Sequence, residues 1–123
     1  MINVEYKSDK DILDVVMTGR IQFAQMKEYC LNLLKDLTTP KHIRILEDAS
    51  QAELLYDIDD AERLGTILEA ELDHRFIVSH ALIRRNPLDT AYGIIRMKTN
   101  TNDRYHLKVF STAENGRDWL LRE

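Results

Sequence analysis

The chain has 123 residues, of which 44% are hydrophobic and 31% are charged, and its net charge is −4. This length and composition suit a single compact domain, residues 1–123, with a sizeable core. No apolar run approaches the roughly 20 residues of a membrane span, and the start of the chain lacks the pattern of a signal peptide. The single cysteine excludes an internal disulfide, so we expect a cytoplasmic protein without a membrane span.

Acidic and basic residues are distributed unevenly along the chain. Residues 1–73 contain 16 acidic and 8 basic side chains, whereas residues 74–123 contain 5 acidic and 9 basic ones. Such a chain can attract an oppositely charged partner or associate with a copy of itself, for example as a homodimer. A simpler interpretation is that solvated acidic and basic faces fall in different segments. The overall acidity and the lack of an aromatic–basic stripe argue against nucleic-acid binding.

The first third of the chain predicts two strands and a helix. Val4 and Tyr6 alternate with polar residues, and residues 12–17 form a second alternating run that Gly19 is expected to end. Apolar residues then recur at helical spacing over 23–37. The helix is expected to stop at residues 38–40, Thr-Thr-Pro, because proline disfavours helical geometry in the residue before it.

The middle of the chain predicts a strand, a helix and a second strand. Residues 42–46 read as a short strand that ends at Glu47 and Asp48. A loop leads to a helix with apolar residues at helical spacing over 61–72. Residues 75–85 have apolar side chains on both faces, which is typical of a strand that is buried on both sides.

The last quarter has clear helix-start signals. Asn86 is expected to cap a helix that begins at Pro87. Residues 105–109 alternate as a final strand, and Ser111 and Glu114 have the spacing of a capping box for a closing helix. The complete order, β-β-α-β-α-β-α-β-α, predicts an α/β sandwich with a four- or five-stranded mixed sheet.

Two groups of packing motifs carry a family resemblance. The segment Leu-Lys-Val-Phe-Ser at 107–111 precedes Gly-Arg-Asp-Trp-Leu at 116–120, and Ala-Leu-Ile at 81–83 leads into Asn-Pro-Leu at 86–88. With the element order, these motifs resemble the STAS domain of anti-sigma-factor antagonists, and most of all the SpoIIAA-like branch that is grouped with SEC14-type lipid-binding folds. Gly116 stands where that branch usually has alanine.

The resemblance implies a non-enzymatic bacterial regulatory module that binds a protein partner or itself. In the usual antagonists, partner switching depends on a serine in an Asp-Ser-Ser-Gly turn that opens the second helix. The matching residues here, Asp-Ile-Asp-Asp-Ala at 57–61, contain no hydroxyl, so phosphorylation in its usual form is not predicted. We expect the acidic middle of the chain to contact the partner through Glu47, Asp48, Asp57, Asp59, Asp60 and Glu62. Acidic residues also stabilise a helix start without any partner.

The alternative function is the binding or sensing of a small apolar or anionic, lipid-like ligand. Arg84, Arg85 and Asn86 would hold its acidic head group at a helix start. In the other interpretation, the two arginines pair with the acidic segment. The apolar residues that could line such a pocket, and that more simply form the core, are Met17, Phe23, Met26, Tyr92, Ile95 and Trp119.

No residue pattern predicts an enzyme, a cofactor or a metal site. The four histidines lack metal-ligand spacing, and His80 is expected to be a hydrogen-bonded core residue. Cys30 lies on an apolar helix stripe, where it acts as a small hydrophobic residue. The acidic residues around Glu47 have oxygen ligands that suit Mg²⁺, but acidic residues at a helix start need no metal. The sequence contains no calcium-loop pattern. Phosphate-loop and nucleophile-elbow motifs are not found in the sequence.

Overall fold

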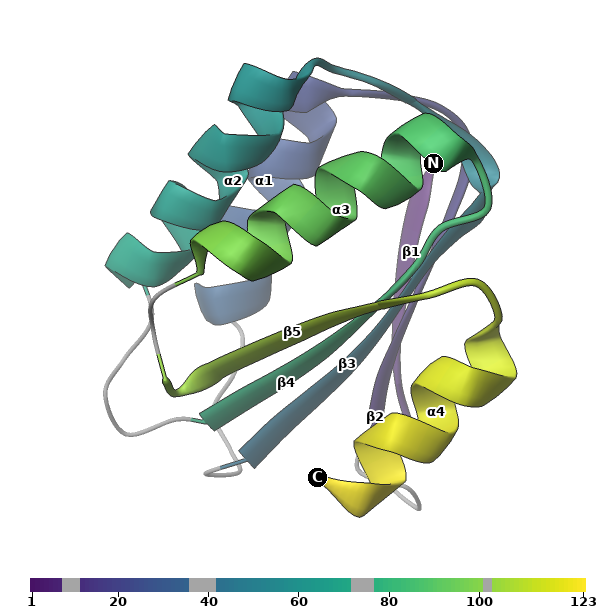
Figure 1. Cartoon of the computed structure of the whole chain (residues 1–123), viewed down its shortest axis with the longest axis vertical. Helices are drawn as coiled ribbons and strands as arrows, with labels where there is room; N and C mark the ends of the chain where they lie inside the picture. The colour runs from purple at the N-terminus through teal and green to yellow at the C-terminus, as the bar shows by residue number, and fades with distance from the viewer. Residues whose placement is uncertain (8–11, 36–41, 72–76, 101–102) are drawn as a thin grey trace.

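The computed structural model describes residues 1–7, 12–35, 42–71, 77–100 and 103–123. These residues form one central sheet with helices on both of its faces (Figure 1). In chain order the elements are β1 (Ile2–Lys7), β2 (Ile12–Gln22), α1 (Phe23–Lys35), β3 (His42–Leu55), α2 (Ile58–Glu71), β4 (Ile77–Ile83), α3 (Pro87–Thr99), β5 (Tyr105–Phe110) and α4 (Ala113–Arg122).

The sheet has five strands in the order β1-β2-β3-β4-β5. The first two strands pair antiparallel, and the three other neighbouring pairs are parallel. The mixed sheet and the element order predicted from the sequence are therefore confirmed. Because each parallel connection returns the chain to the neighbouring strand, α1, α2 and α3 cover one face of the sheet, while α4 covers the other (Figure 1).

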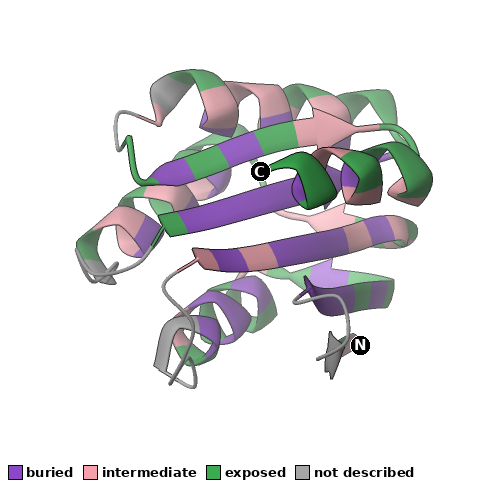
Figure 2. Ribbon diagram, turned by 90° about the horizontal axis from the view of Figure 1, so that it is seen from below, coloured by how far each residue is buried: buried purple, intermediate pink, exposed green. Residues whose placement is uncertain are grey.

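The core lies on both sides of the two central strands, β3 and β4. Side chains alternate between the faces of a strand, so the register assigns each residue to a layer. Ile45 and His80 are paired and face the layer of α1–α3, whereas Leu46 and Ala81 are paired and face α4. Figure 2 shows the nearly continuous burial of β4, as expected for a strand covered on both faces.

Strands β2 and β3 are longer than the sequence predicted. Gly19 does not end β2, because its positive φ of 73° is accommodated after a register irregularity between Val16 and Thr18. The strand continues to Gln22 beside residues 51–55 of β3. The predicted strand end at Glu47 and Asp48 is also wrong, because β3 continues to Leu55 through its pairing with this part of β2.

The helix starts in the last quarter were predicted in part. Asn86 caps α3, with Pro87 at the first position and the Asn86 Oδ1 accepting from the Leu88 N–H over 2.8 Å. The capping-box prediction at Ser111 is wrong by one residue. Thr112 is the N-cap of α4, and its hydroxyl accepts from the Asn115 N–H over 3.2 Å.

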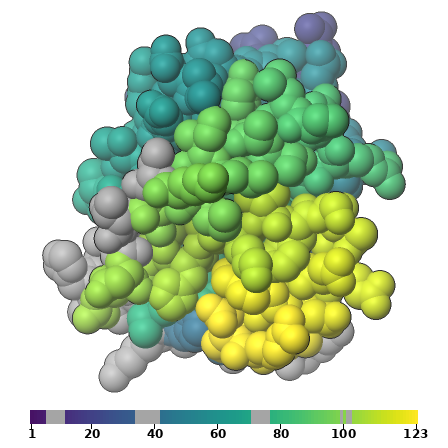
Figure 3. All heavy atoms as spheres, viewed as in Figure 1, coloured from purple at the N-terminus to yellow at the C-terminus, as the bar shows by residue number. Residues whose placement is uncertain are grey.

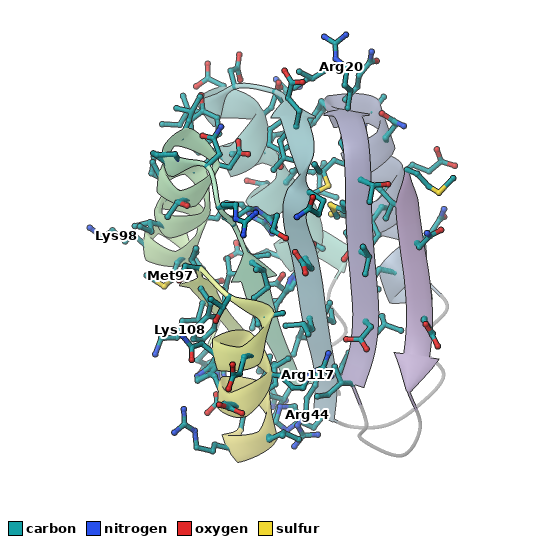
Figure 4. The ribbon with its side chains drawn as sticks, turned by 90° about the vertical axis from the view of Figure 1, so that its right-hand side faces the viewer. Arg20, Arg44, Met97, Lys98, Lys108 and Arg117 are labelled. Carbon is teal, nitrogen blue, oxygen red and sulfur yellow. The ribbon has the colours of Figure 1, made fainter. Side chains whose placement is uncertain are left out.

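Helix α4 is fixed to its own face of the sheet by two arginines. Arg117 lies 3.1 Å from the Asp14 carboxylate, and Arg44 donates to the carbonyl of Leu120 over 3.2 Å. Figure 4 shows Arg44 and Arg117 together beside α4. In Figure 3, side chains of β5 lie between α3 and α4.

Some predicted boundaries cannot be compared with the structure. The helix stop at 38–40 and the first residues of the strand predicted over 75–85 lie outside the described residues. Among the helices that are described, none is long and apolar enough to cross a membrane.

Candidate functional site

An acidic turn begins α2. The N–H of Asp60 donates to Oδ1 of Asp57 over 2.9 Å, and the N–H of Asp57 donates to Oδ2 of Asp60 over 3.4 Å. This reciprocal pair has the arrangement of a capping box. Asp57, Ile58 and Asp59 are exposed, and 40% of the Ile58 surface is accessible to solvent. The turn therefore presents an apolar side chain between two carboxylates on a fixed backbone.

Aromatic contacts hold this turn against the start of α1. The rings of Phe23 and Tyr56 meet edge to face with their centroids 6.5 Å apart. The guanidinium of Arg63 lies over the Phe23 ring, 5.5 Å from its centroid, and 3.9 Å from the Asp60 carboxylate. The position of the acidic turn is thus set by packing between α1 and α2.

The six predicted partner-binding carboxylates do not form one surface. Glu47 has no exposed surface and points into the layer beneath α1–α3. Asp48 faces the opposite side of the sheet, where its Oδ1 accepts from the Ser50 N–H over 2.9 Å. The structure brings together the four that belong to the start of α2, namely Asp57, Asp59, Asp60 and Glu62.

A buried polar network surrounds Glu47. Its Oε1 accepts from the hydroxyl of Tyr29 over 2.9 Å and is 3.0 Å from Nε2 of His80. Its Oε2 accepts from the guanidinium of Arg84. Nδ1 of His80 bonds to the hydroxyl of Tyr105. Because Glu47 accepts from Nε2–H, His80 presents Nδ1 as the acceptor of the Tyr105 proton.

The protonation states follow from this geometry. Burial alone would raise the pKa of Glu47, but His80 and Arg84 outweigh it and hold that pKa below its usual value. Burial lowers the pKa of His80 and outweighs the opposite effect of Glu47. Glu47 is therefore ionised and His80 neutral at pH 7. The expectation that His80 is a hydrogen-bonded core residue is confirmed.

The residues of the predicted ligand site, Arg84, Arg85 and Asn86, do not face a common space. Arg84 is buried and donates to the carbonyl of Ile83 over 3.1 Å as well as to Glu47. Arg85 is exposed, and the side chain of Asn86 is occupied by its cap on α3. The inward direction of Arg84 follows from its partner, because a buried guanidinium requires a buried carboxylate.

The apolar residues proposed to line a pocket are divided between two layers. Met17 and Met26 are fully buried in the cluster beneath α1–α3. Trp119 packs on the opposite face against Phe110, with ring centroids 5.6 Å apart. Cys30 is buried in the first cluster, as predicted, and burial raises the pKa of its thiol to about 12.

A cavity of about 250 Å³ opens between α2 and α3, and we call it the α2–α3 cleft. Glu62, Thr66 and Glu69 form its α2 wall, and Arg96 of α3 and Tyr105 of β5 lie on its other sides. Arg96 is only 5% exposed and is hydrogen-bonded to Tyr105. The cleft is therefore connected through Tyr105 and His80 to the network around Glu47.

Sequence reasoning missed both the cleft and the network. The available signal was the presence of ionisable residues next to apolar strand residues, since Glu47 directly follows Ile45 and Leu46, and His80 lies within the apolar run of residues 76–83. Such residues are seldom fully buried unless they are paired. Arg84 lies only four residues after His80, but Tyr29 and Tyr105 come from two other segments, and no spacing along the chain relates these two tyrosines to Glu47.

The fold was compared with known proteins. No protein-family model matches the chain, and no curated protein matches it. It is similar to the structure of an uncharacterised protein of the DUF3478 family with a SpoIIAA-like fold from Shewanella loihica PV-4. The two superpose with a TM-score of 0.59 and share 22% of their residues, over 98% of this chain and 92% of the other. The chain therefore has a SpoIIAA-like fold, which confirms the fold predicted from its motifs.

The described residues were also compared with the geometry of metal centres. Within these ranges, no group of three or more His, Cys, Asp or Glu side chains is arranged to hold a metal ion. The acidic turn contains carboxylates, but two of them are used to cap α2.

Proposed function

We propose that the chain is a non-enzymatic STAS-type module that binds a protein partner, or a second copy of itself, through the start of α2. The observation that carries the proposal is the exposure of Ile58 between Asp57 and Asp59. An apolar side chain ringed by charge is typical of a contact that is anchored by burial and made specific by its rim.

The rigidity of this turn supports the proposal. Asp57 and Asp60 fix the backbone, and Phe23 and Arg63 fix the helix behind it. A surface that is already ordered loses less conformational freedom when it binds. The partner that fits it has an apolar depression bordered by Lys or Arg side chains.

The location of the acid–base pair supports a binding role rather than a catalytic one. His80 is 1% exposed and Glu47 is fully buried, so neither reaches a molecule outside the core. General acid–base catalysis needs the group within hydrogen-bond reach of the substrate. Free Cys30 is buried as well, which is compatible with the cytoplasmic location that we propose.

The test is affinity capture from a cell extract with two matched double variants. Ile58→Ser/Asp59→Lys changes the acidic turn and leaves the capping residues Asp57 and Asp60 intact. Leu121→Ser/Glu114→Lys is the control, because it makes the same chemical changes at exposed positions of α4 on the opposite face of the sheet. We expect the α2 variant to lose a partner that the control retains.

Asp60 is left unchanged because its carboxylate both caps α2 and lies near Arg63. Reversing the charge of Asp60 would disturb the helix start. A loss of capture could then result from a loss of structure rather than from a lost contact with the partner. Both variants should melt like the unmodified domain, since surface substitutions usually change stability by less than about 0.5 kcal/mol. If both variants captured the same partner equally well, the acidic turn would not be the binding surface. Light scattering of the same proteins would identify a partner that is a second copy.

A further inference from the structure

We propose that two copies of the chain associate by pairing their β1 strands antiparallel, which joins the two sheets into one. This surface is separate from the acidic turn at the start of α2, so the proposal goes beyond the function assigned to that turn. β1 is the first strand in the sheet order, and within the described part of the chain no strand lies beyond it (Figure 4). An edge strand presents unpaired backbone N–H and C=O groups that can bond to a further strand.

The outward backbone groups of β1 can be assigned from its pairing with β2. The N–H of Thr18 donates to the carbonyl of Met1 over 2.9 Å, so this carbonyl points toward β2. In an antiparallel ladder, hydrogen-bonded and non-hydrogen-bonded pairs alternate. Asn3 and Glu5 therefore also bond to β2, whereas the N–H and C=O of Val4 point away from β2 toward the free edge.

Two-fold symmetry limits how two β1 strands can pair. Directly opposite residues of an antiparallel pair lie on the same face of the sheet, and a two-fold axis normal to the sheet keeps the faces of both copies aligned. Only a register that places one residue opposite itself meets both conditions. With the axis at Val4, the outward N–H and C=O of Val4 bond to the same groups of the second copy, and Ile2 is opposite Tyr6.

The side chains of β1 are self-complementary in this register. Val4 is 51% exposed and lies on the α1–α3 face opposite Val15, so the two copies of Val4 meet at the margin of the core. On the other face, exposed Asn3 lies opposite Glu5 of the second copy, where an amide N–H can donate to the carboxylate. An axis at Glu5 places two carboxylates opposite each other, which is unfavourable. An axis at Asn3 pairs fewer residues of the strand.

The opposite edge of the sheet, β5, is not self-complementary in this way. His106 and Lys108 are both exposed and lie on the same face of the strand. Two-fold registers of β5 with itself that are centred on residues 106–108 therefore place basic side chains opposite one another. Lysine on an edge strand commonly prevents such pairing. Charge thus favours β1 over β5 as the edge that meets a second copy.

The direct test is sedimentation velocity of the full chain over a concentration series. We expect a reversible dimer that is largely formed at about 500 µM, as for a weak to moderate association. Hydrogen exchange measured by NMR over the same series should slow at the amide of Val4 and stay unchanged at Asn3 and Glu5, which bond to β2 in either state. A chain that is still monomeric at the highest concentration, or a dimer without this alternation, overturns the proposal.

Val4→Pro tests the backbone contact. Proline removes the outward N–H of Val4, and edge strands accept proline where the N–H faces solvent. We expect a folded chain whose dimer is weakened at least about tenfold, because the central pair of strand hydrogen bonds is lost. An unchanged dissociation constant in a folded Val4→Pro chain overturns the proposal. If Val4→Pro fails to fold, the charge variants of Asn3 decide.

Charge changes at Asn3 test the register without altering the backbone. Asn3→Lys places an ammonium opposite Glu5 of the second copy, and Asn3→Glu places a carboxylate there. Because each pair occurs twice in a two-fold dimer, we expect dimerisation about 2- to 30-fold tighter for Asn3→Lys and weaker by a similar factor for Asn3→Glu. Asn115→Lys and Asn115→Glu make the same changes in net charge at an exposed position of α4. Shifts no larger than those of the Asn115 variants overturn the proposal.

The two proposals fail separately. The acidic-turn variant Ile58→Ser/Asp59→Lys changes no residue of β1, so it should dimerise as tightly as the unmodified chain even where it loses the protein partner. Val4→Pro should lose the dimer and still capture that partner. Loss of the dimer in the acidic-turn variant would assign self-association to the start of α2 and overturn the proposal for β1.

Discussion

Glu47 and His80 place a carboxylate and an imidazole inside a core that is otherwise mostly apolar. Ionised Glu47 receives hydrogen bonds from Tyr29, His80 and Arg84, which together compensate for its lost hydration. Breaking a buried pair by removing one partner typically costs about 3–5 kcal/mol. The network therefore fixes the relative positions of β3, β4 and α1.

The pKa of His80 predicts a pH dependence of folding. Because the folded pKa lies below the ordinary value of 6.5, the unfolded chain takes up the proton first as the pH falls. Stability is therefore fully present above about pH 6.5 and decreases below it, by at most about 1.4 kcal/mol per pH unit for this one group. Urea unfolding at several values between about pH 8 and about pH 5 measures the slope.

The variant His80→Gln should lose most of that slope, because glutamine does not titrate and still offers an N–H to Glu47. His42 is the comparison, since partial burial also lowers its pKa. His42→Gln should keep the larger part of the slope. If His80→Gln and the unmodified chain lose stability equally between these pH values, the assignment of His80 as a neutral core residue is wrong.

For single residues, the sequence predicts whether a side chain is buried better than it predicts its hydrogen-bond partner. The burial of His80 and Cys30 follows from the apolar residues around them. Arg84 was expected to be available to a ligand because a helix start follows it, but its direction is set by Glu47, which lies 37 positions away in the chain. Only the register of β3 against β4 brings the two together.

Among the elements, the long strands β2 and β3 show why boundaries are harder to predict than the elements themselves. Each continues past a residue that commonly ends a strand, Gly19 in β2 and Asp48 in β3. Residues 18–22 of β2 pair with residues 51–55 of β3, and these ladder hydrogen bonds extend both strands where the local strand propensity is low. The cap of α3 was predicted correctly because Asn86 and Pro87 act within one turn.

Two helix glycines should respond in opposite ways to the same substitution. A Cβ atom at Gly116 would lie 2.6 Å from Cδ1 of Ile83 and 3.0 Å from Cδ1 of Leu46, so α4 is packed closely on the sheet. Gly116→Ala should destabilise the domain by about 1–2 kcal/mol after its gain in helix propensity, because overpacking costs about 1–3 kcal/mol.

Gly65→Ala is the matched control in α2, where the added methyl meets no atom within 4 Å. It should stabilise the domain by up to about 1 kcal/mol. Chemical denaturation of the two variants compares them directly. A Gly116→Ala domain as stable as Gly65→Ala would show that α4 packs less closely than described.

For the whole molecule, the fold separates a supporting interior from the surface that we assign to the partner. The sheet and the network around Glu47 support the structure, the acidic turn at the start of α2 faces outward, and the α2–α3 cleft opens along the same helix. The element order and the sheet could be predicted because periodicity and helix starts are local, whereas the cleft depends on how α2 and α3 pack.

The most direct test of the central claim is hydrogen–deuterium exchange of the domain alone and in complex with its captured partner. The amides of the first turn of α2 lack intrahelical acceptors and should exchange quickly in the free domain, apart from those bonded to Asp57. We predict that the partner slows exchange over residues 57–62 and leaves α4 unchanged. Slowed exchange over α4 or β5, with residues 57–62 unaffected, would contradict the assignment of the acidic turn as the binding surface.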